Sequence, residues 1–391
     1  MNMSLVIGCL LVGYLIGVAM LGWSLLQSMR MLRGHGQLPA PAGDASTTDW
    51  PLLDVVIPVK DEEAHIAACL ESILAQDYPN KHILVVNDRS TDGTAAVVDA
   101  IRARHPEVRR IDIAELPEGC YGKPHALSVA MRELTGEWVA FVDSDFELRS
   151  DCLRTLVQHV RTQWLDWLAI MGRPRLTQFW ERLLVPLLGA VTYAWYDPRK
   201  IADPKWDNAI GSGFLVVRRE RYAEIGGHGA VIRAYDEDSA IMRIAKRAGH
   251  RIAYVLTPEL FTLRLYGTLQ RTVRGISRTL IGGLKTLPRF LITINGLNFV
   301  SLLPIGILAG LGLAAHFGVA VPHANIWLAT SLVHLLLSTA LAVVVYRQAG
   351  LCRRLALLHP LGSAMMIGIC IRAARELMSG RRIVWRGTSY Q

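Results

Sequence analysis

Acidic side chains stand at three places where a predicted strand ends or a predicted helix begins. Asp88 follows one apolar run of strand length, Asp143 and Asp145 follow another, and Asp238 closes an acidic triplet ahead of a helical pattern. Carboxylates hold divalent cations and accept protons from hydroxyl groups. The three places are therefore candidates for metal binding and general-base chemistry.

The pair Asp143 and Asp145 predicts a metal site. Its two carboxylates are at positions i and i+2, where the chain leaves the apolar strand 137–142. Mg²⁺ and Mn²⁺ prefer hard oxygen ligands, and Mg²⁺ is commonly held by one or two carboxylates plus substrate phosphates. A solvated loop is the alternative interpretation, but a D-x-D directly after an apolar strand favours the metal.

The other two places each allow two interpretations. Asp88 lies in a turn-rich stretch, so it is either a turn or cap residue or a ligand-binding group. Asp236, Glu237 and Asp238 precede a helix, and acidic residues are favoured in a first helical turn because they face the positive end of the helix dipole. They are therefore either cap residues or the source of a base.

Two smaller signals lie between these places. Lys123 opens a helical pattern, which is a position suited to binding an anion. Gly211 and Gly213 flank Ser212 just before an apolar run, and glycine allows a ligand to approach the backbone closely. Ordinary loop chemistry explains either signal equally well.

The pattern of elements predicts how these residues are positioned. Apolar runs alternate with helical stripes, and such alternation predicts a mainly parallel α/β sheet of Rossmann type, with ligands beyond the carboxyl ends of its strands. The strand-like runs are 52–59, 82–87, 110–116 and 137–142, and the helical patterns are 62–76, 91–104 and 124–134. The chain lacks a P-loop and a G-x-G-x-x-G after the first strand, which argues against a nucleoside triphosphatase and a dinucleotide oxidoreductase.

The composition predicts a membrane protein. The 391 residues are 51% hydrophobic and only 19% charged, against about 25% charged in a soluble domain. The six cysteines form no C-x-x-C pair, so neither a zinc ribbon nor a disulfide scaffold is indicated. The net charge of +9 comes from basic residues that flank apolar segments, which favours attraction to anionic phospholipid headgroups over nucleic-acid binding.

Three uncharged stretches could enter a membrane. Residues 1–29 have no basic start, so they predict a retained anchor rather than a cleaved signal peptide. Residues 291–346 suffice for two helices, and 355–371 form either a third span or a re-entrant segment. Basic residues after the first anchor place the middle of the chain in the cytoplasm. A full third crossing would put the basic tail outside, against the same rule, and the sequence leaves this conflict open.

Two further stretches could face the membrane surface. Residues 183–196 are apolar but short, and they are either an interfacial segment or a buried helix. The second stretch is 263–290, a basic amphipathic segment that suits the surface of an anionic membrane.

The chain as a whole is therefore predicted to contain five parts. They are an anchor at 1–29, a linker at 30–51, a cytoplasmic domain at 52–262, the basic amphipathic interfacial segment at 263–290, and a C-terminal membrane region with two to three spans and a basic tail at 291–391.

The motifs, taken in order, resemble those of family 2 glycosyltransferases. Residues 58–63 (P-V-K-D-E-E) resemble the family's P-V-x-N-E-E start, and 86–94 (V-N-D-R-S-T-D-G-T) are similar to V-D-D-G-S-T-D-G-T. Residues 76–79 (Q-D-Y-P) match the turn after the first helix. Asp143 and Asp145 match the metal-binding D-x-D, while Glu237 and Asp238 match the E-D pair that contains the base.

Within this family the chain looks most similar to membrane lipid glycosyltransferases of the ceramide glucosyltransferase-like, hopene-associated and carotenoid types. The supporting features are one N-terminal anchor, C-terminal apolar segments, and residues 385–390, which resemble a W-[RK]-G-x-x-Y tail. Arg271 and Arg274 fit the family's Q/R-x-x-R-W signature, but Gly275 replaces its Trp. That difference weakens the analogy to processive synthases, in which the Trp helps place the acceptor.

The resemblance implies a GT-A fold and a role for each motif. Pro58 and Glu62 would line the nucleoside, Asp88 would contact the uracil, and Lys123 would bind the nucleotide sugar. The two metal ligands would be Asp143 and Asp145, which would hold the diphosphate through Mg²⁺ or Mn²⁺. The general base would be Asp238. Arg271 and Arg274 would steady the leaving diphosphate, and the anomeric carbon would be inverted.

The expected function is therefore transfer of a sugar from a nucleotide sugar, which the resemblance implies to be a UDP-sugar, to a membrane lipid hydroxyl. A divalent cation can stabilise the charge that develops on the leaving diphosphate, and a carboxylate can take the proton of the attacking hydroxyl. Two alternatives stay open, a processive polysaccharide synthase and a non-catalytic membrane protein that binds nucleotide sugars. The first predicts a polymeric product, and the second predicts binding without turnover.

Overall fold

The computed structural model describes residues 3–34, 38, 49–379, 383–385 and 388–390. These residues form two units. One contains Met1–His35, Leu176–Thr192 and Leu265–Ser379, and the other contains Gly36–Arg175, Tyr193–Arg264 and Gly380–Gln391. Most of the predicted linker lies outside the described residues, as do Arg386 and Gly387 of the tail motif. Each unit is described below by itself.

The first unit is helical. It contains α1 (Met3–Gly34), most of α6 (Phe179–Trp195), α9 (Leu269–Leu284), α10 (Leu287–Leu297), α11 (Leu303–His316), α12 (Ala324–Gln348) and α13 (His359–Met378). A π-helical turn, Asn298–Leu302, joins α10 to α11, and a 3₁₀ turn, Arg353–Leu358, leads into α13.

Four helices of the described chain are long and apolar enough to cross a membrane. They are Val6–Leu26, Leu287–His316, Ala324–Gln348 and Arg353–Met378. A span needs about 20 apolar residues, so each of the four meets the length requirement. The segment with the open interpretation, 355–371, lies within the last of them.

The two stretches predicted at the membrane surface bury their apolar faces inside the first unit. The hydroxyl of Tyr346 on α12 donates to the carbonyl of Leu183 on α6 at 2.8 Å, and both residues are fully buried. This contact favours the buried-helix interpretation of 183–196, although the sequence assigns that stretch to the cytoplasmic domain. Helix α9 packs on α13 through buried residues such as Ile276 and Leu280, while Arg271 and Arg274 are exposed.

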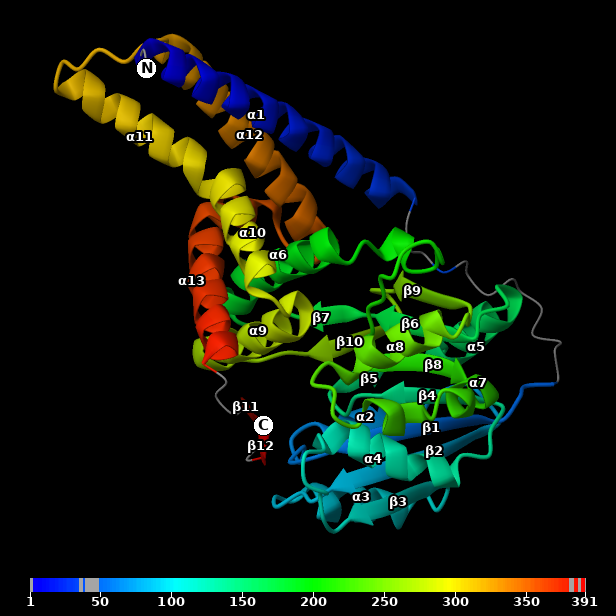
Figure 1. Cartoon of the computed structure of the whole chain (residues 1–391). Helices are drawn as coiled ribbons and strands as arrows, with labels where there is room; N and C mark the ends of the chain where they lie inside the picture. Colours follow the sequence, from blue (N-terminus) through cyan, green and yellow to red (C-terminus); the bar gives the residue numbers. More distant parts are fainter. Residues whose placement is uncertain (1–2, 35–37, 39–48, 380–382, 386–387, 391) are drawn as a thin grey trace. The chain divides into compact units, whose positions relative to one another are not determined.

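The second unit is built on a seven-stranded sheet in the order β3-β2-β1-β4-β8-β6-β9. In Figure 1 β3 is at the bottom of this unit and β9 at the top. The strands are β1 (Leu53–Val59), β2 (Lys81–Asp88), β3 (Val108–Ile113), β4 (Trp138–Val142), β6 (Trp167–Met171), β8 (Phe214–Arg218) and β9 (Ile252–Leu256).

The first four of these strands confirm the predicted parallel arrangement, because β1 pairs in parallel with β2 and β4, and β2 with β3. Strand β8 then runs antiparallel to both β4 and β6. A second sheet contains β5 (Phe146–Leu148), β10 (Phe261–Arg264) and β7 (Arg173–Arg175). A short hairpin pairs β11 (Ile383–Trp385) with β12 (Thr388–Tyr390).

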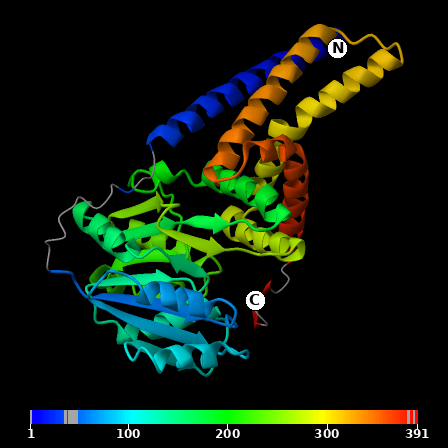
Figure 2. The same ribbon diagram turned by 180° about the vertical axis from the view of Figure 1, so that it is seen from behind.

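Helices cover both faces of the large sheet, as the continuous apolar strands require. Alternate residues of β1 enter opposite cores, because successive side chains of a strand point to opposite faces. Val55 and Ile57 pack with α2 (Ile66–Leu74), α3 (Thr94–Arg102) and α5 (Cys152–Thr162). Val56 packs with α4 (Gly122–Ala130), α7 (Arg219–Glu224) and α8 (Glu237–Arg247). Figures 1 and 2 show the two layers from opposite sides.

Candidate active site

The antiparallel strand β8 lies inside the sheet, between β4 and β6. Because β8 runs against β4, its first residue Phe214 lies opposite Val142, the last residue of β4. The chain on either side of this pair is joined by a hydrogen bond from the amide of Asp143 to the carbonyl of Gly213 at 3.0 Å. The Gly-Ser-Gly segment therefore meets the D-x-D segment at the carboxyl end of β4.

Three carboxylates converge here on one ammonium group. The Nζ atom of Lys123, the second residue of α4, lies 2.9 Å from Asp143 Oδ1, 2.9 Å from Glu237 Oε1 and 3.2 Å from Asp238 Oδ2. All four side chains are between 12% and 33% exposed, so they are partly shielded from solvent but open to a ligand. The cluster brings together three of the predicted site residues with Glu237, which matched the motif but carried no predicted role.

Two glycines allow this convergence. A Cβ atom on Gly213 would clash with the carboxylate of Asp143, and one on Gly211 would clash with the backbone of Asp238. The hydroxyl of Ser212 between them is buried and bonded to the backbone of Ile170 and Phe214. The sequence left open whether these glycines admit a ligand or belong to an ordinary loop, and in the structure they let the two acidic residues approach the start of β8.

The electrostatics of the cluster follow from its burial and its excess of negative charge. Burial raises the pKa of Asp238 well above its usual value, Glu237 and Asp143 raise it further, and Lys123 opposes them. Burial alone would lower the pKa of Lys123, but Asp143, Asp238 and Glu237 together raise it well above its usual value. One cation is thus shared among three carboxylates.

Asp238 lies in the first turn of α8, as the first-turn interpretation requires, but it is not the cap residue. The cap position of α8 is occupied by Asp236, whose carboxylate accepts from Arg243 Nη2 at 3.1 Å within the same helix. The carboxylate of Asp238 instead receives Lys123, which is 115 residues away in the chain. Its orientation is therefore set by tertiary contact with α4, which a cap interpretation does not explain.

The residues predicted for the nucleoside lie at the ends of β1 and β2. Pro58 is opposite Val86 in the sheet, and the buried Glu62 follows β1 with its amide bonded to Thr94 Oγ1 at 2.8 Å. Asp88 ends β2 and is only 3% exposed. A Cβ on Gly122 would clash with its carboxylate, so the start of α4 connects Asp88 with the Lys123 cluster.

The metal prediction rests on the chemistry of the donor set. In the described part of the chain no group of three or more His, Cys, Asp and Glu side chains could hold a metal ion by itself. Asp143 and Asp145 supply two carboxylates at the carboxyl end of β4, and the backbone carbonyl of Asp145 is held by the amide of Arg264 at 3.2 Å. Two carboxylates completed by substrate phosphates suit Mg²⁺, so the residues fit such an ion.

Arg271 and Arg274 lie on α9 in the first unit, with exposed side chains. Their predicted contact with the diphosphate stays a prediction. The ring of Tyr266 occupies the space beside Gly275, so a Cβ atom at position 275 would clash with it.

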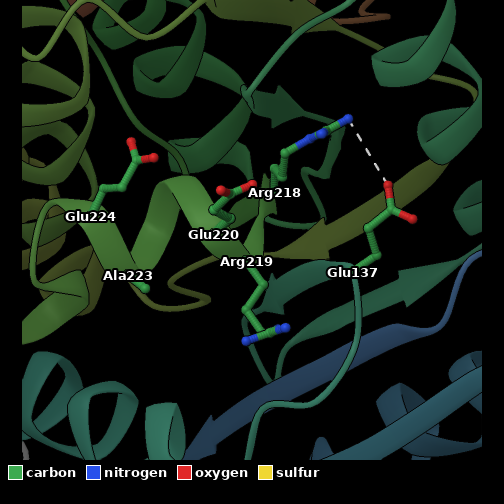
Figure 3. Close-up of a pocket in the computed structure, with 6 residues that line it drawn as sticks. All are labelled: Glu137, Arg218, Arg219, Glu220, Ala223 and Glu224. Carbon is green, nitrogen blue, oxygen red and sulfur yellow. Dashed lines mark ion pairs between the residues drawn. The ribbon is translucent and has the colours of Figure 1, made fainter.

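A separate pocket lies at the opposite end of β4 and β8. It has a volume of about 530 Å³ and is lined by Glu137, Arg218, Arg219, Glu220, Ala223 and Glu224 (Figure 3). Glu137 precedes β4, whereas Arg218 ends β8, so this pocket is at the other edge of the sheet from the Lys123 cluster.

Part of the chain is similar to known glycosyltransferases. Residues 54–225 match the family model for Glycosyl transferase family 2. The chain is 30% identical over 145 residues to the beta-monoglucosyldiacylglycerol synthase of Synechocystis sp., covering 36% of this chain and 30% of the relative. It is 28% identical over 192 residues to the 4,4'-diaponeurosporenoate glycosyltransferase of Staphylococcus aureus, covering 48% and 50%. The matched parts therefore span at most about half of these relatives.

Among solved structures, the chain is similar to the mannosyltransferase PcManGT from Pyrobaculum calidifontis in complex with GDP-Man and Mn²⁺. The TM-score is 0.48 at 21% identity, and the match covers 96% of this chain and 99% of the other. The matched segment 54–225 spans β1 to β8, of which all but β5 and β7 belong to the large sheet. It also contains Asp88, Lys123, Asp143 and Asp145. The likeness to Glycosyl transferase family 2 therefore covers less than half of the chain and lies in the α/β sheet of the second unit.

Proposed function

We propose that this protein is a membrane-bound inverting glycosyltransferase that moves a sugar from a nucleotide sugar, with UDP as the nucleotide, to a lipid hydroxyl. The observation that carries the proposal is the convergence of Asp143, Glu237 and Asp238 at the carboxyl end of β4, within and beside a family 2 domain. This is the sheet edge at which α/β folds bind ligands. The four apolar helices and the glycolipid-type relatives support a lipid acceptor.

The roles follow from position. Asp88, beside Glu62 and Pro58, binds the nucleoside, and Lys123 and the amino end of α4 receive the diphosphate. Asp143 and Asp145 would hold Mg²⁺ or Mn²⁺, which supplies Lewis-acid stabilisation of the leaving diphosphate when bound. Asp238 accepts the proton of the attacking hydroxyl. Burial and the neighbouring carboxyl groups raise its pKa, which makes this carboxylate a stronger proton acceptor than an exposed one.

The acceptor would come from the membrane. The exposed basic residues of α9, including Arg271 and Arg274, support contact of the first unit with anionic headgroups. Retained anchoring through α1 and the basic residues after it support a cytoplasmic position for the second unit. Binding donor and acceptor side by side would supply the orientation that the reaction needs.

The test is incubation of the purified protein with a panel of nucleotide sugars and a total lipid extract, followed by mass spectrometry of the lipids. We expect a single sugar increment on one lipid class, lost in the presence of EDTA. A polymeric product would favour the processive alternative, and nucleotide binding without any product would favour the non-catalytic one.

Asp145→Asn tests the metal assignment in the same assay. We expect turnover to fall by about 10²-fold or more, since the lost charge weakens cation and diphosphate binding together. Asp207→Asn is the matched control, because Asp207 is 60% exposed and pairs with Arg247 on the surface. Asp145→Asn activity equal to wild type, or wild-type activity unaffected by EDTA, would refute the metal assignment.

A further inference from the structure

Arg89 has a backbone conformation that non-glycine residues rarely adopt. Its φ angle is +55°, in the left-handed region, and it directly follows the last residue of β2. The aligned family motif has Gly at this position, which takes the conformation without steric cost. Strained backbone at a non-glycine residue persists only where the surroundings enforce it, and such residues gather at functional sites.

The surroundings of Arg89 enforce the strained turn through several hydrogen bonds. Lys60 Nζ donates to the carbonyls of Asp88 at 3.4 Å and Arg89 at 3.1 Å. Asp61 clamps the following residues, because its amide donates to Ser90 Oγ at 3.0 Å and its carboxylate accepts from the Thr91 amide at 2.8 Å. The segment after β1 thus holds the segment after β2 in place.

The left-handed turn directs the Arg89 side chain onto its own neighbour. Consecutive side chains of a strand point to opposite faces, so an extended chain would separate Asp88 and Arg89. Instead Arg89 Nε lies 2.7 Å from Asp88 Oδ1, and Arg89 Nη2 lies 3.0 Å from Asp88 Oδ2. This two-bond pair locks the Asp88 carboxylate against Gly122, with only 3% of Asp88 exposed.

The locked carboxylate keeps capacity for a ligand. Each carboxylate oxygen has two acceptor positions, and Arg89 uses one on each. His125 of α4 interacts electrostatically with both Asp88 and Arg89, and its buried Nδ1 has no hydrogen-bond partner among the described residues. The Asp88 carboxylate is an acceptor, and it is fixed beside the cation Arg89 and the polar Nδ1 atom of His125. This arrangement matches a base that has a ring N–H flanked by carbonyl oxygens. Uracil offers this pattern, whereas guanine offers two adjacent N–H donors.

We propose that Arg89 is a positioning residue that fixes the Asp88 carboxylate and thereby sets the preference for uracil over guanine nucleotides. This inference rests on the proposed function as a nucleotide-sugar enzyme. The strained backbone at Arg89 is retained because it places the Arg89 side chain on the carboxylate of the adjacent residue, Asp88.

Arg89→Gly separates strain from recognition. It removes the left-handed strain, which favours folding, but it also leaves the buried Asp88 carboxylate without its partner, which opposes folding. The melting temperature is therefore measured beside the binding constants to confirm that the variant is folded. UDP binding, measured by titration calorimetry, should weaken about tenfold, and the ratio of UDP to GDP affinity should fall by a similar factor. Arg89→Asn, which also tolerates the left-handed region, provides a second folded variant with the same expected loss.

Trp164→Gly is the matched control. Trp164 also has a positive φ of +53°, but it is 70% exposed and lies in the turn between α5 and β6. It should show the same relief of strain in its melting temperature with unchanged UDP and GDP binding.

A double-mutant cycle tests whether Arg89 acts through Asp88. If it does, Asp88→Ala combined with Arg89→Gly should bind UDP no more weakly than Asp88→Ala alone. Additive losses would overturn the positioning role, as would wild-type affinity and base preference in Arg89→Gly. Failure of the wild-type protein to bind any nucleotide would instead refute the proposed function.

Discussion

Charged side chains gather at both ends of the β4–β8 pair, but the two clusters are organised differently. At the carboxyl end of β4, one ammonium group from α4 contacts three partly buried carboxylates, of which one follows β4 and two belong to α8. At the other end, Glu137 faces Arg218 at 3.9 Å (Figure 3), and the two side chains are 52% and 40% exposed. Arg221 pairs with Glu224, which lies three residues further along the chain.

The difference shows what distinguishes a site from a charged surface. Exposed pairs of opposite charge are mutually neutral and are screened by water, so they contribute about 0–1 kcal/mol each. The Lys123 cluster gathers three carboxyl groups around one ammonium group, with reduced solvent access and two glycines that bring the acids together. Such an arrangement is costly unless a ligand or cation compensates it, which makes it the better candidate for catalysis.

The largest expected effect is that of Asp238→Asn. Asn caps helices as well as Asp does, so a cap role predicts little change. As a general base Asp238 cannot be replaced, and we expect lipid glycosylation to fall by ~10²–10⁴-fold while nucleotide binding and melting temperature stay near wild type.

Near-normal turnover of a stable Asp238→Asn protein would contradict the assignment. Glu237 would then be the next candidate, because it shares Lys123, whereas Asp236 is directed to Arg243. Glu224→Asn at the exposed cluster is the matched control and should retain full turnover.

Gly213→Ala should have the next largest effect. The new Cβ would overlap the Asp143 carboxylate, and overpacking typically costs about 1–3 kcal/mol. Because Asp143 would have to move, we expect turnover to drop ~10²-fold, as small misplacements of reacting groups do. Gly229→Ala is the control, since its nearest atom beyond the chain neighbours is Ser128 Oγ at 3.4 Å. Equal activity of the two variants would show that turnover does not require a glycine at position 213.

The sequence predicted the local parts of this site and missed the long-range ones. Asp88 and the D-x-D pair were found because each follows an apolar strand, and the parallel strands β1 to β4 follow from alternating periodicity. The contact of Lys123 with Asp238 spans 115 residues, and no local pattern encodes it. Gly211 and Gly213 were noticed, but their neighbours became clear only from the antiparallel pairing of β8 with β4.

Helix α6 illustrates the same limit. Its apolar composition suits either a membrane surface or a protein core, and only its contact with Tyr346 on α12 favours the core. The match of Glu237 to a motif likewise did not reveal its role, because the shared cation belongs to another helix. Periodicity therefore predicts elements and their edges, whereas the convergence of side chains depends on tertiary packing.

Acid should destabilise the second unit through His228, which lies in the core near the Lys123 cluster. Burial, together with a smaller effect of Lys123, lowers the pKa of His228 from 6.5 to about 3. Below pH 6.5 the unfolded chain binds a proton that folded His228 excludes, so stability is fully present above pH 6.5 and is lost as pH falls toward 3. Melting temperatures should fall less steeply over this range in His228→Gln than in wild type. The exposed His105→Gln should keep the wild-type slope, and an unchanged slope in His228→Gln would contradict this account.

The smallest expected effect is that of Glu137→Gln in the pocket of Figure 3. Its partner Arg218 lies 3.9 Å away and also packs over the ring of Trp138 at 5.2 Å, a contact that the substitution leaves intact. Gln keeps a side-chain oxygen that can accept from Trp138 Nε1, now at 3.1 Å from Glu137 Oε1. We therefore expect a change of about 1 kcal/mol or less in the free energy of unfolding and no change in turnover or UDP affinity. Glu237→Gln makes the same chemical change in the Lys123 cluster, where it removes a carboxylate 2.9 Å from the shared ammonium, and its turnover should fall. If Glu137→Gln reduced turnover as much as Glu237→Gln does, the two ends of the sheet would not differ in function. The distinction drawn between the Lys123 cluster and the exposed ion pairs would then be wrong.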